Sequence, residues 1–242
     1  NDSRKIVFTN ISIDDGDKPG HTDYRHGTHV AGSLVCHHID DIGGLIPEND
    51  MTAPSYMSKL VFQDIVNENG WNPPDIDLLF SELARYGGVI HSNSWGDDTT
   101  AYTSRSYDVD VWSFENPYSL AFIAPGNNGR MVLEPANARN VVSVAATSSA
   151  TQLWGSSSHG PTEEGERGVF LSAPGYQIKS AGADGVLNSN NNGSRTLSGT
   201  SMSTPLAAST TAVFQELVEK GIINFANETV GNTPSGPLLR SL

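Results

Sequence analysis

Apolar runs along this chain alternate with stretches in which apolar residues recur at helical spacing. The runs are short, several are rich in Val and Ile as buried strands are, and turn-rich segments separate them. They cover Ile6 to Phe8, Lys59 to Ile65, Gly88 to His91, Leu120 to Ala124, Val141 to Ala146 and Val169 to Ser172. Helical spacing covers His29 to His38 and Asp75 to Tyr86. Strands that alternate with helices predict an α/β fold, with a doubly wound, mostly parallel sheet and helices on both faces.

A longer helix is predicted from Thr200 to Glu219. A turn of small residues at Ser198 and Gly199 precedes it, and Gly221 follows its end. We expect this helix to be buried against the sheet. The pattern contains no repeat and supports no second domain, so residues 1–242 are predicted to form a single domain.

Composition agrees with one globular unit and narrows the class of partners. Of the 242 residues, 37% are hydrophobic and 17% are charged, which is enough apolar material for a large core. Lys and Arg number 14 against 27 Asp and Glu, so the net charge of -13 has the wrong sign for binding nucleic acid. The apolar runs are far shorter than the ~20 residues that cross a bilayer, so no membrane partner is predicted.

The first candidate for chemistry is Ser201, which a small-residue turn places at the start of the long helix. Unpaired N–H groups and the positive end of the helix dipole gather there, and they would stabilise an oxyanion on a carbon attacked by Ser201. An isolated Ser before a helix is more often only a capping residue. The nucleophile motif of α/β-hydrolases, Gly-x-Ser-x-Gly, is excluded because Ser203 stands where its second Gly would be. Ser201 therefore needs a base in order to act as a nucleophile.

His26 is the candidate base. It opens the segment His-Gly-Thr-His-Val-Ala-Gly, residues 26–32, again at the head of a helix and among residues small enough for close approach. From this position His26 would take the proton of the Ser201 hydroxyl.

Two other kinds of site use neighbouring residues. His26 and His29 could bind a metal with help from His37 and His38, but no carboxylate or Cys lies at a matching spacing. A Cys–His peptidase would use Cys36, the only cysteine, which lies on the apolar side of its helix as a packed, inert thiol would.

A third candidate is Asn127, in a turn of residues 124–129 that follows the apolar run Leu120 to Ile123. A turn at the end of a strand can aim an Asn amide into the crevice in which α/β sheets bind ligands. Asn127 could donate to the developing oxyanion, a role worth roughly 3 kcal/mol where such a donor has been removed. An ordinary Asn-Gly turn is the simpler interpretation of this segment taken alone.

Together these segments resemble the subtilisin-like serine peptidases. His-Gly-Thr-His-Val-Ala-Gly carries the family's histidine at His26, Gly-Thr-Ser-Met-Ser-Thr-Pro its nucleophile at Ser201, and Pro-Gly-Asn-Asn-Gly its oxyanion-binding amide at Asn127. Residues 157–161 and 172–175 are similar to further landmarks, so the resemblance covers nearly the whole chain. It implies a serine endopeptidase that hydrolyses peptide bonds through an acyl-enzyme on Ser201, with His26 as general base.

Residues 91–96, continued at 102–103, are particularly similar to the high-alkaline, oxidatively stable bacterial branch of that family. The resemblance implies that Ser94, Trp95 and Gly96 form an edge strand that pairs with an extended substrate. Trp95 would wall a substrate subsite, although a Trp taken alone is more often a core residue.

The resemblance also sets expectations for the substrate and its surroundings. Ala124 and Gly126 would line the primary specificity pocket. The expected partners are extended peptide or protein substrates, with no nucleic acid and no membrane. A secreted monomer is expected that needs no cofactor for catalysis, and structural calcium is an option although the sequence contains no decisive calcium loop.

The acid of the triad is not evident. In the family it lies before the histidine, usually as Asp followed by Thr or Ser and then Gly, and no such triplet precedes His26. The carboxylates available there are Asp14, Asp15, Asp17 and Asp23, of which Asp14 and Asp15 come after an apolar stretch as a strand end would. The segment from Lys5 onward resembles the part of the family sequence just after the acidic motif, so we expect the acid upstream of Asn1 and a chain that is incomplete at both ends.

Loss of the strand that bears the acid would leave a gap in the middle of the sheet. Turnover would suffer too, because replacing the acid of a related triad by Asn lowers it about ten-thousand-fold. The alternative function is therefore a catalytically inactive, subtilase-like module that binds peptides without cleaving them.

Overall fold

The structure is a computed structural model that describes residues 6–10, 25–37, 51–67, 70–71, 73–166, 168–186, 189, 191–224 and 231–242. Its strands are β1 (Ile6–Asn10), β2 (Leu60–Gln63), β3 (Val66–Asn67), β4 (Gly70–Trp71), β5 (Ile90–Asn93), β6 (Leu120–Ile123), β7 (Val142–Ser149), β8 (Gln152–Leu153), β9 (Leu171–Pro174), β10 (Ile178–Ala181) and β11 (Ser194–Leu197). Its helices are α1 (His26–Val35), α2 (Ile76–Arg85), α3 (Ser104–Glu115), α4 (Thr200–Glu219) and α5 (Gly236–Ser241). Asp14, Asp15, Asp17 and Asp23 lie outside the described residues.

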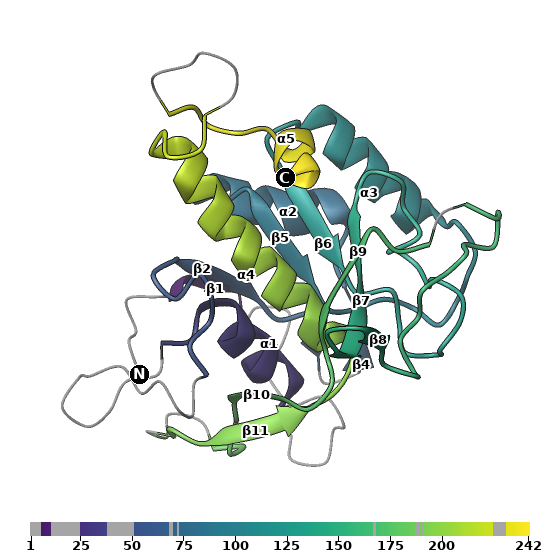
Figure 1. Cartoon of the computed structure of the whole chain (residues 1–242), viewed down its shortest axis with the longest axis horizontal. Coiled ribbons are helices and arrows are strands. Elements are labelled where there is room, and N and C mark those ends of the chain that lie inside the picture. The colour runs from purple at the N-terminus through teal and green to yellow at the C-terminus, as the bar shows by residue number, and fades with distance from the viewer. Residues whose placement is uncertain are drawn as a thin grey trace.

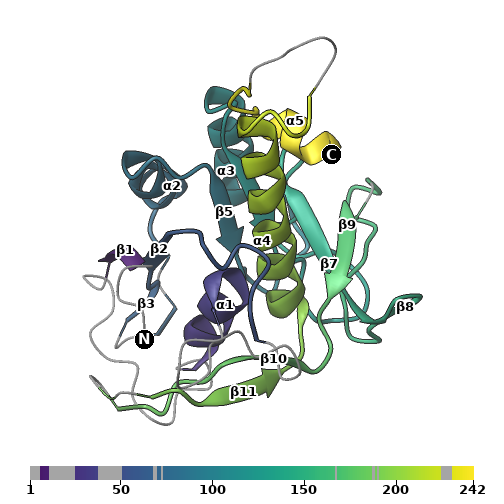
Figure 2. The same cartoon turned by 60° about the vertical axis from the view of Figure 1, so that its left-hand side comes forward.

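The main sheet contains β5, β6, β7 and β9 in parallel, with β8 antiparallel to β7 (Figure 1). Ile90 of β5 lies opposite Leu120 of β6, and Phe122 of β6 lies opposite Val142 of β7. Helix α4 covers one face of the sheet, while α2 and α3 cover the other (Figures 1 and 2). The predicted α/β fold, a mostly parallel sheet with helices on both faces, is confirmed.

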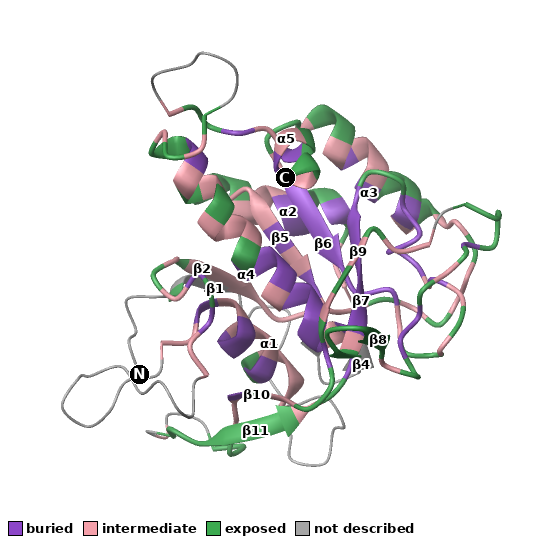
Figure 3. Ribbon diagram, viewed as in Figure 1, coloured by how far each residue is buried: buried purple, intermediate pink, exposed green. Residues whose placement is uncertain are grey.

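Strand β6 shows why these residues form a central strand. Successive side chains of a strand point to opposite faces, so Ala121 and Ile123 face one helical layer and Leu120 and Phe122 face the other. The first layer contributes Ile76, Leu79, Phe80, Val109 and Trp112, and the second contributes Ala207, Ala208 and Leu239. Every residue of β6 is buried (Figure 3), which explains a continuously apolar sequence rather than an alternating one.

Helix α4 has the bounds predicted from the sequence and packs against the sheet through small residues. Ser203, Ala207 and Ala208 are buried on its sheet-facing side. The Ser203 hydroxyl donates to the Val144 carbonyl of β7 at 3.2 Å, so this position is adapted to contact with the sheet.

Strands β1 and β2 form a separate parallel pair. Among the described strands, β2 pairs only with β1, and β5 pairs only with β6. A cavity of about 1520 Å³ lies between β2 and β5, and its apolar lining includes Phe62, Leu79, Phe80, Leu83, Ile90 and Met202. We call the part of the cavity between β2 and β5 the interstrand slot. The predicted gap in the middle of the sheet stays a prediction.

The structure also differs from the sequence-based prediction. Helix α3 was not predicted, because only Ser106, Val109 and Trp112 are buried along it and no long apolar stripe marks it. The β10–β11 hairpin was not predicted either, since most residues of β11 are exposed. Helix α1 begins at His26 rather than His29 and ends at Val35, so its predicted bounds were displaced toward the C-terminus.

His91 of β5 is a buried histidine in an aromatic environment. Its side chain is 5% exposed, and its Nε2 has no hydrogen-bond partner among the described residues. The ring centroid lies 4.3 Å from that of Phe80 and 6.4 Å from that of Trp112. Burial lowers the pKa of His91 to about 3.

Because of His91, the protein is expected to unfold more easily in acid. Below a pH of about 6.5 the unfolded chain binds a proton at His91 that the folded protein does not, so the free energy of unfolding falls toward pH 3. In urea denaturation, the free energy of unfolding of the wild type should fall between pH 7 and pH 4. In His91→Phe this fall should be smaller by about 3 kcal/mol. His29, whose pKa burial also lowers, acts in the same direction in both proteins. An unchanged pH dependence in the variant would contradict this assignment.

Candidate active site

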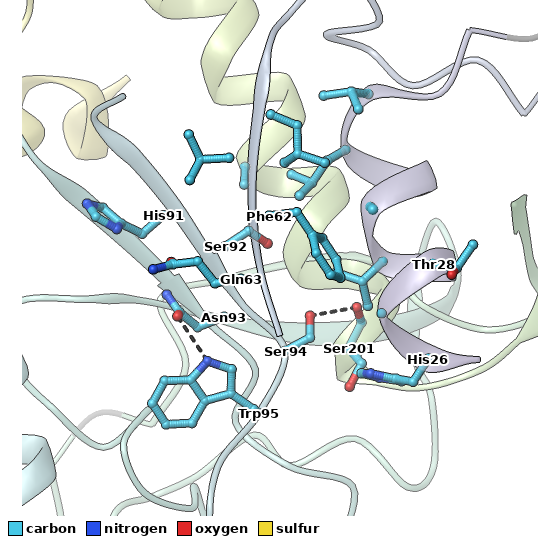
Figure 4. Close-up of a pocket in the computed structure, with 18 of the residues that line it drawn as sticks. His26, Thr28, Phe62, Gln63, His91, Ser92, Asn93, Ser94, Trp95 and Ser201 are labelled. Atoms are coloured by element: carbon cyan, nitrogen blue, oxygen red, sulfur yellow. Dashed lines mark hydrogen bonds between the residues drawn. The ribbon is translucent and has the colours of Figure 1, made fainter. Parts of the chain in front are cut away.

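Three sequence-predicted residues line the same cavity: His26, Asn127 and Ser201. Figure 4 shows the imidazole of His26, from α1, pointing toward the side chain of Ser201, from α4. Residues that are far apart in the sequence thus line one cavity.

Ser201 lies in the first turn of α4, and the turn before it is fixed by main-chain hydrogen bonds. Gly199 N donates to Gly175 O at 2.8 Å, and Met202 N donates to Gly199 O at 3.0 Å. A first-turn amide has no carbonyl four residues earlier within its helix, so the Ser201 N–H can donate to a bound anion.

His26 is the first residue of α1, and contacts one turn further along hold this helix in place. His29 is fully buried, and its Nε2 lies 3.0 Å from Ile178 O and 3.1 Å from Arg195 O in the β10–β11 hairpin. The Ser180 hydroxyl donates to His29 O at 2.9 Å. The second histidine of the motif therefore anchors α1 and leaves His26 facing the cavity.

The side chain of Asn127 is tied to the start of α4. Its Oδ1 accepts hydrogen bonds from Thr200 N at 2.9 Å and from Thr200 Oγ1 at 3.2 Å. With the carbonyl oxygen held in this way, the Nδ2 of Asn127 remains as a donor on the other side of the amide. Thr200 Oγ1 also lies 3.2 Å from Gly126 O, so one buried threonine joins the Asn127 loop to the start of α4.

The loop that carries Asn127 requires glycine at position 126. Gly126 has a φ of +108°, and a Cβ there would lie 2.6 Å from Leu133 Cδ1. Ala124 is buried, and neither Ala124 nor Gly126 lines the described cavity. Their place in the primary specificity pocket stays a prediction.

Ser94, Trp95 and Gly96 line the cavity, but they follow β5, which ends at Asn93, and the structure assigns none of them to a strand. The Ser94 hydroxyl donates to Ser201 O at 2.9 Å, which ties this segment to α4 (Figure 4). Trp95 Nε1 donates to Asn93 Oδ1 at 3.1 Å. The segment is thus held against the start of α4, and its pairing with substrate stays a prediction.

Comparison with known proteins decides the family. The sequence pattern of the subtilase family matches residues 1–233, nearly the whole chain. This chain belongs to the subtilase family. Serine protease AprX of Bacillus subtilis (strain 168) is 28% identical over 225 residues, covering 79% of this chain and 48% of AprX. The chain therefore spans about half the length of that relative.

Solved structures support the subtilase fold. Sphericase matches with a TM-score of 0.65 and 23% identity over 90% of this chain and 67% of its own. A mutant protease domain of PatA has a TM-score of 0.64 and 23% identity, over 89% of this chain and 72% of that domain. A cold-adapted subtilisin-like serine proteinase has a TM-score of 0.59 and 22% identity, over 90% of this chain and 66% of its own. Family membership and the likeness to AprX support a serine peptidase, whereas the high-alkaline branch stays a prediction.

The described residues give no support to a metal site at His26 and His29 or to a Cys–His peptidase at Cys36. Within the described part of the chain, no three His, Cys, Asp or Glu side chains gather as a metal site, and no helix is long and apolar enough to span a membrane. His29 contacts main-chain carbonyls, and the ring of His37 lies 4.6 Å from that of Tyr56, while His38 lies outside the described residues. Cys36 caps the end of α1. Structural calcium and secretion stay predictions.

The sequence analysis did not predict two residues that hold the side chains of the Asn127 loop in place. Thr200 orients Asn127, and the buried Ser158 hydroxyl donates to Asn128 Oδ1 at 2.9 Å. Thr200 stands next to Ser201, a position that could have drawn attention to it. Ser158 lies in a segment noted only as a family landmark, and its contact with Asn128 emerges only from the folded chain.

Proposed function

We propose that this subtilase domain is a serine endopeptidase with Ser201 as nucleophile and His26 as general base. The observation that supports the proposal is that His26, Ser201 and Asn127, whose amide oxygen accepts from Thr200, line a single cavity. A nucleophile, a base and an oriented amide donor are the parts that acyl transfer requires.

In the proposed mechanism Ser201 Oγ attacks the carbonyl carbon of the peptide bond, and His26 accepts the hydroxyl proton. The Nδ2 of Asn127 and the N–H of Ser201 stabilise the negative charge on the carbonyl oxygen. His26 then gives its proton to the leaving nitrogen as the C–N bond breaks. Water, deprotonated by His26, hydrolyses the ester and restores Ser201.

The substrates are proposed to be extended peptides or unfolded proteins. Ser94 to Gly96 end beside the nucleophile helix, and their main chain would pair with the residues before the scissile bond. Binding of this kind depends on backbone groups and tolerates many sequences. We expect the domain to act as a monomer and to need no cofactor for catalysis.

The position of the interstrand slot supports an upstream origin of the triad acid. Strands β2 and β5 end at Gln63 and Asn93, and the next residue after β5, Ser94, contacts the nucleophile helix. A parallel strand in the slot would have its carboxyl end at the same edge of the sheet. An Asp at that end would lie near His26, where it could orient the imidazole.

The second candidate function is an inactive peptide-binding module. The observation that favours it is the interstrand slot. A domain in which no central strand fills the slot could still bind peptides along residues 94–96 without cleaving them efficiently. The two functions differ in hydrolysis, since only the enzyme releases new amino groups from an unfolded protein substrate.

The proposed role of Asn127 predicts a specific kinetic effect in the full-length protein. Asn127→Ala should lower kcat by about 10²- to 10³-fold and change KM little, because the lost donor acts mainly on the transition state. Thr200→Val keeps the Asn127 amide and removes one of its two tethers, so it should cost less than about tenfold in kcat. Equal kcat values for Asn127→Ala and the wild type, measured on an unfolded protein substrate, would exclude Asn127 from the oxyanion site.

A further inference from the structure

A buried carboxylate lies behind the predicted substrate-binding strand. Glu134 is 1% exposed, yet both of its oxygens are satisfied. Oε1 lies 2.5 Å from Arg105 Nη1, and Oε2 accepts a hydrogen bond from Thr103 Oγ1 at 2.5 Å. Burying a carboxylate is costly unless it is paired in this way, so the contacts with α3 are what allow a charge to lie here.

Arg105 joins this carboxylate to the segment that contains Trp95 and Asp97. The same Nη1 lies 2.7 Å from Asp97 Oδ2, and the guanidinium carbon lies 5.8 Å from the centroid of the Trp95 ring. Burial lowers the pKa of Arg105, but its hydrogen bonds and charge interactions with Asp97 and Glu134 outweigh burial and raise it overall. Arg105 thus connects Trp95 and Asp97 to the buried carboxylate of Glu134.

The main chain around Glu134 contacts both the segment after Gly96 and the loop that carries Asn127. Asp97 N donates to Glu134 O at 3.2 Å, and Glu134 N donates to Thr99 O at 2.9 Å. A Cβ on Gly96 would lie only 2.2 Å from Glu134 O, so the two chains are in close contact. One residue earlier, Leu133 N donates to Pro125 O at 2.9 Å, which reaches the loop that carries Asn127.

We propose that the Arg105–Glu134 pair is a positioning element that fixes Trp95 and Gly96 for pairing with the substrate residues before the scissile bond. The inference rests on the proposed function, because it assigns the substrate to the Ser94–Gly96 strand. Arg105 and Glu134 themselves touch neither the nucleophile nor the reacting carbonyl. Their loss should therefore weaken binding of long peptides more than it slows the chemical step.

The kinetic test compares two substrates with the same scissile bond in the full-length protein. One has four residues before that bond, and the other has a single acyl-blocked residue. Arg105→Gln should raise KM for the long substrate about tenfold with kcat within about twofold, and it should leave the short substrate nearly unchanged. Arg139→Gln is the matched control, because it breaks an exposed ion pair with Glu164 elsewhere on the surface.

A second variant distinguishes the loss of positioning by the Arg105–Glu134 pair from a general disruption of the fold. Glu134→Gln in the Arg105→Gln background removes the unpaired buried charge and should recover at least about threefold of the lost KM. Loss of kcat/KM on both substrates to the same degree, or no recovery in the double variant, would overturn the proposal. Thermal unfolding of each variant shows whether the protein is folded under the assay conditions.

Binding measurements keep this proposal separate from the proposed function. The affinity of the long peptide is measured calorimetrically on Ser201→Ala with and without Arg105→Gln, so no turnover is needed. An about tenfold higher Kd with Arg105→Gln supports the positioning role even if the wild type cleaves nothing. An unchanged Kd overturns that role even if the wild type is an active peptidase.

Discussion

Replacing Ser201→Ala is expected to reduce peptide hydrolysis by about a millionfold in kcat, the size of effect that accompanies loss of the nucleophile from a catalytic triad. The side chain is the attacking group in the proposed mechanism, so its loss removes the atom that would form the acyl-enzyme. Ser203, two residues further along α4, is fully buried and donates to Val144 O, so it faces the sheet instead of the cavity. The measurement is kcat of the purified full-length protein on an unfolded protein substrate.

The same experiment includes two informative controls. The double variant His26→Ala with Ser201→Ala should be no slower than Ser201→Ala alone, because the two residues act as one unit. Thr210→Ala replaces an exposed hydroxyl on α4 and should keep full activity. Residual activity of Ser201→Ala above about one thousandth of the wild type would argue for a different nucleophile.

The second large effect concerns the interstrand slot. A chain extended upstream of Asn1, with a strand in the slot and an Asp at its carboxyl end, is expected to hydrolyse peptides about 10⁴-fold faster than the same chain with Asn at that position. The reason is that the carboxylate holds the tautomer of His26 and stabilises the imidazolium formed during attack. The measurement is kcat of the two extended chains on one peptide substrate.

Replacing each Asp before His26 by Asn tests whether the triad acid lies within the given sequence instead. Asp14→Asn, Asp15→Asn, Asp17→Asn and Asp23→Asn should each leave kcat within about threefold if the acid comes from the upstream strand. A loss of about 10⁴-fold in one of these variants would instead identify that residue as the acid. Filling the slot should also raise the thermal unfolding temperature, because it buries apolar groups such as Phe62 and Ile90.

Elements covered by apolar neighbours were predictable from the sequence. Strand β6 is buried on both faces and reads as a continuous apolar run, and α4 has a small-residue turn before it and a glycine after it. Helix α3 was missed because it contacts the core through only a few residues, Val109 and Trp112 among them. Hydrophobic periodicity reports the amount of buried surface, so weakly buried elements leave a weak signal.

The candidate site was predictable where its chemistry is local. Ser201 and His26 each stand at the head of a helix among small residues, a pattern visible in short segments of sequence. The carboxylate Glu134 and its partner Arg105 lie 29 residues apart in the sequence, and their pairing depends on the packing of α3. Interactions of this kind arise from the tertiary structure, so the chain order alone gave no sign of them.

Labelling with a fluorophosphonate probe tests the central claim most directly, because the probe reacts with a serine only when a base and an oxyanion site activate it. In the full-length protein we expect one modified residue, Ser201, identified by mass spectrometry of the digested protein. Labelling should disappear in Ser201→Ala and fall sharply in His26→Ala. Persistent labelling of Ser201→Ala at the wild-type level would contradict the assignment of Ser201 as the nucleophile.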